Sequence, residues 1–168
     1  MDLNDAILKK RIIDIEMPGN KTHTGVCLKA NKNIWILVNY DYSLQKFNGL
    51  SIFKNELIET FSVWKKGKLK ILEDNIGNYE LAFNLKKINT FYTCLMKAST
   101  LGVIAFFIGQ DYKNYYVGKI ASINRTTVNI RLVNKDGKFS KYKTIKLVSI
   151  SYFSFCTDYE IALQKATR

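Results

Sequence analysis

The chain has 168 residues, of which 47% are hydrophobic, 13% aromatic and 24% charged, so it has enough apolar side chains to form a packed core. Its net charge of +12 is unevenly placed, because residues 65–168 hold eighteen Lys/Arg against seven Asp/Glu, while residues 1–64 are almost balanced. No apolar run approaches the roughly 20 residues of a membrane helix, and the acidic start does not resemble a signal peptide. The sequence therefore predicts a cytoplasmic protein that does not enter a membrane and whose second part favours a polyanionic partner.

The first part of the chain predicts short strands that follow one short helix. In chain order the expected elements are a helix at 3–11, a strand at 12–15, a strand that carries Gly25, a strand at 33–39, a long hairpin at 40–49 and a pair of strands that closes on Phe61. The run over 33–39 is apolar at consecutive positions, which is typical of a strand buried on both faces. His23 lies in the polar sequence GNKTHTG, which predicts a solvated turn.

The second part repeats this order after a longer helix. Apolar residues recur at helical spacing from Tyr79 to Ala98, with Asn78 or Asn84 as a candidate cap and 99–102 as the end. The elements expected next are a strand at 103–108, a strand that carries Gly118, an alternating strand at 127–134, an Asp-Gly hairpin at 134–140, a pair of strands that closes on Phe153 and a helix from Asp158.

Two segments of the chain resemble each other. The first begins TGVCLKANKNIWILVN and the second begins VGKIASINRTTVNIRLVN. The corresponding positions are Gly25 and Gly118, Asn31-Lys32 and Asn124-Arg125, and Phe61 and Phe153. A spacing of about 92–95 residues is far longer than a solenoid repeat, so the pattern predicts a domain duplication.

A helix followed by five short strands, with a glycine on the second strand and an Asn-containing turn after it, resembles the Sm-like family of small barrels, which are relatives of the SH3-type barrels. The resemblance covers residues 11–61 and 99–155. It implies a mainly β fold with a few short helices, in which two five-stranded barrels stand in tandem. The domains expected are a near-neutral barrel at 1–64, a connecting segment at 65–98 and a strongly basic barrel with a C-terminal helix at 99–168. The family's Arg-Gly pair, which helps to hold RNA, is replaced by Lys54-Asn55 and Lys146-Leu147, so the resemblance does not extend to that pair.

The sequence lacks the motifs of an enzyme. His23 is the only histidine, and none of the G-x-S-x-G, H-E-x-x-H or G-x-x-x-x-G-K-[ST] motifs is present. Cys27, Cys94 and Cys156 lie in apolar runs without paired spacing, which argues against a zinc site or a disulfide. The acidic pair Glu73-Asp74 is interpreted as part of a surface loop. These observations predict a binding protein with no catalytic residues, no cofactor and no metal.

The candidate site is a nucleic-acid-binding surface on the second predicted barrel. Between residues 113 and 146 there are nine Lys/Arg residues and one acid, interleaved with tyrosines. Nucleic-acid sites combine cations that contact phosphates with flat rings that stack on bases. The candidate residues are Lys119, Arg125, Arg131, Lys138, Lys141 and Lys143 for phosphates, and Tyr115 and Tyr142 for bases. The basic run 65–70 adds a smaller patch.

Two classes of partner remain open. In the first, the basic barrel binds RNA, DNA or a nucleotide, which predicts steep salt dependence. In the second, the chain holds a protein partner through sheet edges and exposed aromatics, as an inhibitor or immunity-type protein does, which predicts shallow salt dependence. The competing structural interpretation is that the lysines are ordinary solvated residues and that the tyrosines wrap the core with only their hydroxyls in water.

Overall fold

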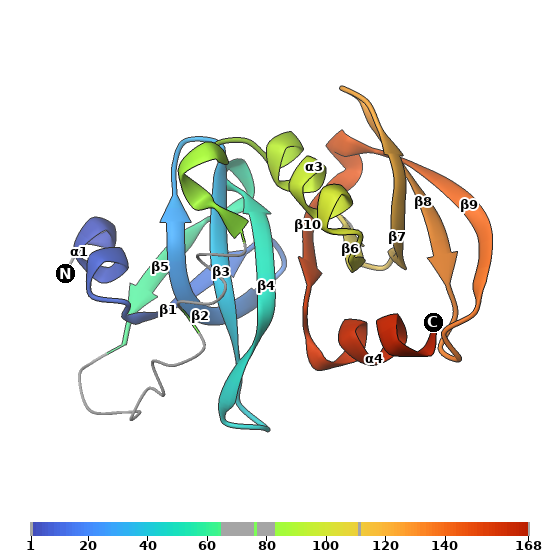
Figure 1. Cartoon of the computed structure of the whole chain (residues 1–168). Coiled ribbons are helices and arrows are strands. Elements are labelled where there is room, and N and C mark those ends of the chain that lie inside the picture. Colours follow the sequence, from blue (N-terminus) through green and yellow to red (C-terminus); the bar gives the residue numbers. More distant parts are fainter. Residues whose placement is uncertain (1, 65–75, 77–82, 111, 168) are drawn as a thin grey trace. The chain divides into compact units, whose positions relative to one another are not determined.

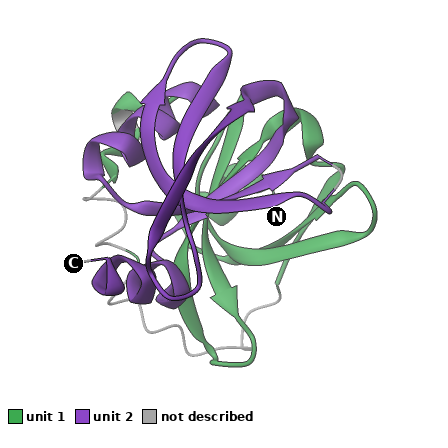
Figure 2. Cartoon of the chain, turned by 90° about the vertical axis from the view of Figure 1, so that its right-hand side faces the viewer, with its two compact units in different colours: residues 1–89 green, residues 90–168 purple. Residues whose placement is uncertain are grey.

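The structure is a computed structural model that describes residues 2–64, 76, 83–110 and 112–167 (Figure 1). The chain divides into two compact units, unit 1 at residues 1–89 and unit 2 at residues 90–168 (Figure 2). Both are rich in strands and have few helices, as the sequence indicates. Within the described part of the chain, no helix is long and apolar enough to cross a membrane.

Unit 1 is built on five antiparallel strands. Its elements are α1 (Leu3–Leu8), β1 (Ile12–Met17), β2 (Lys21–Ala30), β3 (Ile34–Asp41), β4 (Lys46–Lys54), the 3-10 turn η1 (Asn55–Leu57), β5 (Thr60–Val63) and the 3-10 turn η3 (Leu85–Lys87). The strands lie in the order β5-β1-β2-β3-β4. Apolar residues from four of them, such as Ile15, Val26, Val38 and Phe53, are fully buried and form the core.

Unit 2 repeats this strand order. Its elements are α3 (Phe91–Leu101), β6 (Ile104–Gly109), β7 (Tyr115–Ile123), β8 (Thr127–Val133), β9 (Phe139–Lys146), the 3-10 turn η4 (Leu147–Ser149), β10 (Ile150–Phe155) and α4 (Asp158–Ala166). The strands lie in the order β10-β6-β7-β8-β9. A ring cluster fills the core, where Phe153 stacks on Phe107 and Phe155 at centroid distances of 5.9 Å and meets Phe91 of α3 edge-on at 5.3 Å.

The prediction of two closed five-stranded barrels is wrong. The ten strands belong to one open antiparallel sheet, and within the described residues no pairing joins β4 to β5 or β9 to β10. The last strand of each set pairs instead with the first, β5 with β1 and β10 with β6. Hydrophobic alternation identifies the strands, but closure depends on strand tilt and stagger, which alternation does not encode.

The helix predicted from Tyr79 to Ala98 is not continuous, because a left-handed residue and a 3-10 turn separate Phe83 from helix α3. Helix α3 starts at Phe91, where Thr90 and Thr93 form a reciprocal capping box. Asn84, a proposed cap, adopts a left-handed conformation before the 3-10 turn η3 and makes no side-chain cap. The other proposed cap, Asn78, and the start of the predicted helix lie outside the described residues. The predicted end is confirmed, because Gly102 closes α3 with a φ of 63°.

The glycines singled out by the internal resemblance occupy the same place in each unit. A Cβ on Gly25 of β2 would lie 2.2 Å from the carbonyl oxygen of Val38, and one on Gly118 of β7 would lie 2.4 Å from that of Arg131. Both positions therefore require glycine, because the neighbouring backbone leaves no room for a side chain. In each unit a bulge follows shortly after the glycine.

The turns after these two strands are also built alike. The side-chain oxygen of Asn31 accepts hydrogen bonds from the backbone N–H groups two and three residues later, at 2.8 and 3.0 Å. Asn124 does the same at 2.9 and 2.8 Å. An asparagine that closes a turn on its own backbone explains why the same residue stands at both places.

Candidate nucleic-acid interface

Strands β7, β8 and β9 place three predicted site residues in one row. Lys119 of β7 lies directly opposite Arg131 of β8, and Arg131 lies directly opposite Tyr142 of β9. Directly paired residues of antiparallel strands project from the same face of a sheet. We call these three residues the basic row, and all three side chains are exposed.

Two further rows extend the same face of β7–β9. Ser122, Asn129 and Thr144 lie opposite one another in the next row, and Thr127 and Lys146 form the row after that. We call the surface made by these rows and the basic row the polar face. It has the following residues: Lys119, Ser122, Thr127, Asn129, Arg131, Tyr142, Thr144 and Lys146. None of them is acidic, so the face presents only cations, hydroxyls and an amide.

Asn129 is a member of this face that our sequence reasoning did not select. Its side-chain oxygen is buried and has no hydrogen-bond partner. A buried acceptor without a partner is costly and is a candidate for binding a ligand group. The alternation of 127–133 places Asn129 on the side of Arg131, and this signal could have identified it.

The other predicted phosphate contacts do not join the basic row. Lys143 lies opposite Ile130, on the reverse face of the sheet, and Lys141 lies outside the basic row, at the irregularity of β9 between Tyr142 and Phe139. Lys138 lies in the hairpin between β8 and β9, and Arg125 lies in the turn between β7 and β8. The single basic surface expected from the sequence is therefore divided between two faces and two turns.

The two predicted stacking residues are both accessible. Tyr115 is 62% exposed and Tyr142 is 59% exposed. Tyr115 lies almost flat on Phe106, with ring centroids 5.4 Å apart and 13° between the planes. For these two side chains the interpretation of rings wrapped into the core does not hold, because more than half of each is open to solvent.

Arg131 is held in place by an aromatic neighbour. Its guanidinium carbon lies 4.8 Å from the centre of the Phe139 ring, a distance at which a cation is attracted by the ring face. Phe139 packs on the buried cluster of Ile104, Val117, Val133 and Leu163, to which helix α4 contributes Leu163. The packing of Phe139 on this cluster thus orients the guanidinium of Arg131.

The positive charge of this region is not neutralised locally. Unit 2 has twelve Lys/Arg against four Asp/Glu. Within the described part of the chain, none of Lys119, Arg125, Arg131, Lys138, Lys141 and Lys143 forms an ion pair with a carboxylate. Cations without carboxylate partners produce a positive potential that attracts polyanions.

His23 differs from its prediction as a solvated turn residue. It lies within β2, and its ring packs against Phe53 with the centroids 4.9 Å apart. Burial, with a smaller contribution from the charge of Lys21, lowers the pKa of His23 to about 4. The polar sequence around it therefore forms a strand with a neutral histidine, and the prediction of a solvated turn is wrong.

The other candidates for chemistry are unremarkable in the described structure. Cys27, Cys94 and Cys156 are not joined in disulfides, and burial raises the pKa of Cys27 to about 12, which disfavours its thiolate. Over the described ranges, no group of three or more His, Cys, Asp and Glu residues is placed to hold a metal ion. The basic run 65–70 and the pair Glu73-Asp74 lie outside the described residues.

The chain matches no protein-family model, no curated protein and no solved structure. Its function is therefore inferred from the residues and geometry of the chain itself.

Proposed function

We propose that this chain is a non-catalytic binding protein that holds single-stranded nucleic acid on the polar face of unit 2. The observation that carries the proposal is the basic row, in which an exposed tyrosine stands beside two cations that have no acidic partner among the described residues. Neighbouring strands lie about 4.8 Å apart, so the row spans roughly 10 Å. Lys119 and Arg131 then contact phosphates, while the Tyr142 ring stacks on a base.

Asn129 supplies the only amide of the polar face, and its side chain must turn outward to read a base edge, because its oxygen is buried. Its unpartnered oxygen lies one row away from Tyr142 on the same face. An asparagine side chain pairs well with the hydrogen-bonding edge of adenine. Phosphate contacts alone give affinity without sequence preference, so any preference is expected to come from this amide.

A protein partner is the second candidate. The hairpin between β3 and β4 in unit 1 exposes Tyr42 by 58% and Leu44 by 53%. Exposed apolar side chains of this kind are typical of protein-binding surfaces. This alternative also explains the lysines of β9 as protection of an edge strand against unwanted pairing.

The test is binding of mixed-sequence single-stranded RNA and DNA of about 20 nucleotides, a length that exceeds the site of a single small domain, measured by fluorescence anisotropy at low salt. The double variant Lys119→Gln/Arg131→Gln should lower affinity by about tenfold or more, because each charge-assisted contact contributes roughly 1 kcal/mol. A matched control, Lys21→Gln/Lys32→Gln, removes the same charge from exposed positions of unit 1 and should bind like wild type.

The two candidate functions give different outcomes in this assay. If the wild type binds neither nucleic acid at low salt, the proposal is wrong and the protein-partner alternative takes its place. If both double variants lose affinity equally, attraction follows net charge, and the polar face is not the binding site.

A further inference from the structure

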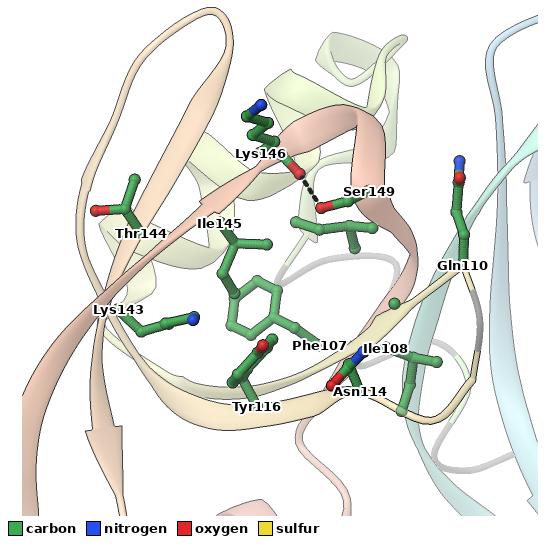
Figure 3. A pocket seen from close by; sticks show the side chains of 12 residues that line it. Phe107, Ile108, Gln110, Asn114, Tyr116, Lys143, Thr144, Ile145, Lys146 and Ser149 are labelled. Atoms are coloured by element: carbon green, nitrogen blue, oxygen red, sulfur yellow. Dashed lines mark hydrogen bonds between the residues drawn. The ribbon is translucent and has the colours of Figure 1, made fainter.

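Unit 2 also contains a pocket on the reverse face of its sheet (Figure 3). Its volume is about 390 Å³, which is within the roughly 300–1,000 Å³ of small-molecule sites. The side chains that matter most for its chemistry are Phe107, Tyr116, Lys143, Ile145 and Ile150. Thr144 and Lys146 of the polar face also line the pocket. The basic row does not, and Lys143 projects from the opposite side of the sheet to that row.

The floor of the pocket is apolar and partly aromatic. Phe107, Ile145 and Ile150 are buried, with exposed fractions of 1%, 7% and 1%. Phe107 lies directly opposite Tyr116 in the pairing of β6 with β7, so the two rings stand side by side on one face. Such a surface favours a flat, weakly polar group over an aliphatic chain of the same size.

A single cation projects into this pocket. Figure 3 shows Lys143 pointing toward Tyr116, while Thr144 and Lys146 point away from the pocket. The Lys143 ammonium lies 5.2 Å from the centre of the Tyr116 ring. None of the twelve lining residues is acidic, so nothing in the lining neutralises this charge. The pocket therefore favours a ligand that carries negative charge beside its flat group.

Two amide side chains at the rim of the pocket could form hydrogen bonds with the edge of a flat ligand. Gln110 and Asn114 both line the pocket. The Gln110 amide nitrogen donates a hydrogen bond of 2.8 Å to the carbonyl oxygen of Val148, which fixes the orientation of the amide. A small number of oriented polar groups around an apolar floor is the usual composition of a specific ligand site.

We propose that this pocket binds one nucleoside monophosphate, with the base against the ring pair of Phe107 and Tyr116 and the phosphate at Lys143. The flat base can pack against the aromatic rings on the floor of the pocket. The phosphate can accept a charge-assisted hydrogen bond from the Lys143 ammonium, the one cation that projects into the pocket. This inference goes beyond the proposed function, because the pocket and the basic row lie on opposite faces and use different cations and rings.

The experiment is a calorimetric titration of the full chain with AMP, GMP, CMP and UMP at low salt. At least one of them should bind saturably, and Lys143→Gln should weaken it by about tenfold or more, as expected for a charge-assisted hydrogen bond. The matched control is Lys141→Gln, which removes the same charge from the same strand, two residues away, at a position that does not line the pocket. It should retain wild-type affinity.

A second pair of variants tests the ring. Tyr116→Phe keeps the flat surface and should bind nearly as well as wild type, whereas Tyr116→Leu should lose roughly five- to a hundredfold in affinity, the range of one stacked base. Circular dichroism of each variant shows whether it folds. If Tyr116→Leu does not fold, the nucleotide that binds is compared with its nucleoside and with inorganic phosphate, because the nucleotide must bind more tightly than either part.

The inference is overturned if no nucleotide binds, if inorganic phosphate binds as tightly as the nucleotides, or if Lys141→Gln weakens binding as much as Lys143→Gln. Its failure is distinguishable from failure of the proposed function. The Lys119→Gln/Arg131→Gln variant, which changes only the polar face, should still bind the mononucleotide as the wild type does.

Discussion

Tyr142 is the aromatic residue of the basic row, and more than half of it is open to solvent. The residue is 59% exposed and lies directly opposite Arg131 in the pairing of β8 with β9. Replacing Tyr142 with Ala should weaken binding of single-stranded RNA by about 1–3 kcal/mol, because a base loses its stacking surface. Tyr142→Phe keeps the ring and should bind within about 0.5 kcal/mol of wild type. Anisotropy titrations of both variants measure the difference, and equal losses in the two would point to the hydroxyl instead.

His23 gives a prediction for the pH dependence of stability. Its pKa is about 4 in the folded chain and about 6.5 when unfolded, so protonation favours the unfolded state. The stabilisation from the neutral ring is complete above about pH 6.5 and is lost as the pH falls toward 4, by roughly 3 kcal/mol in all.

The measurement compares urea unfolding of the wild type with that of His23→Gln across the pH range between these two pKa values. The variant lacks the titrating ring, so its unfolding free energy should fall less steeply over this range. Identical pH profiles would show that His23 is not buried as described.

At the scale of elements, the close approach of β7 and β8 should make Gly118 sensitive to substitution. A Cβ there would lie 2.4 Å from a backbone oxygen, so Gly118→Ala should destabilise the chain by about 3 kcal/mol or more through overpacking. The control is Gly19→Ala, at a left-handed position with open space around it, which should cost only about 1–2 kcal/mol. Chemical unfolding of both variants tests the ordering, and a smaller loss for Gly118→Ala would contradict the pairing described.

Helix α4 should be stabilised more by its packing than by its N-terminal cap. Thr157 and Glu160 form a reciprocal capping box at its start, and Leu163 packs on the cluster beneath Phe139 and Arg131. Thr157→Ala should cost about 1 kcal/mol of stability, and Leu163→Ala about 2–5 kcal/mol. Thermal unfolding measures both losses, and the reverse ranking would show that the cap holds α4 more strongly than its packing.

Individual elements were largely predictable from local pattern. The alternation over 127–134 corresponds to β8, the Asp-Gly hairpin comes directly after it, and the last helix begins at Asp158 as predicted. The continuous helix predicted from Tyr79 is wrong, because apolar spacing does not show that Asn84 takes a left-handed conformation. His23 was misplaced because a polar sequence gives no indication that Phe53, thirty residues later, packs against it.

The arrangement of elements and of the candidate site was less predictable. Alternation and turn residues indicate strands, but whether a sheet closes depends on geometry that they do not encode. The site residues were chosen by charge and aromatic content, and strand register then divided them between two faces. Lys119, Arg131 and Tyr142 came together only because β7, β8 and β9 pair in this particular register.

For the molecule as a whole, the central claim is that the polar face of unit 2 contacts phosphates. The most direct measurement is the dependence of the single-stranded RNA binding constant on salt concentration, for wild type and for Lys119→Gln/Arg131→Gln. The account predicts a steep slope for wild type and one shallower by about 1.4 units for the variant, because each phosphate neutralised on a single strand adds roughly 0.7 to the slope. Equal slopes for the two proteins, or no binding by the wild type, would contradict it.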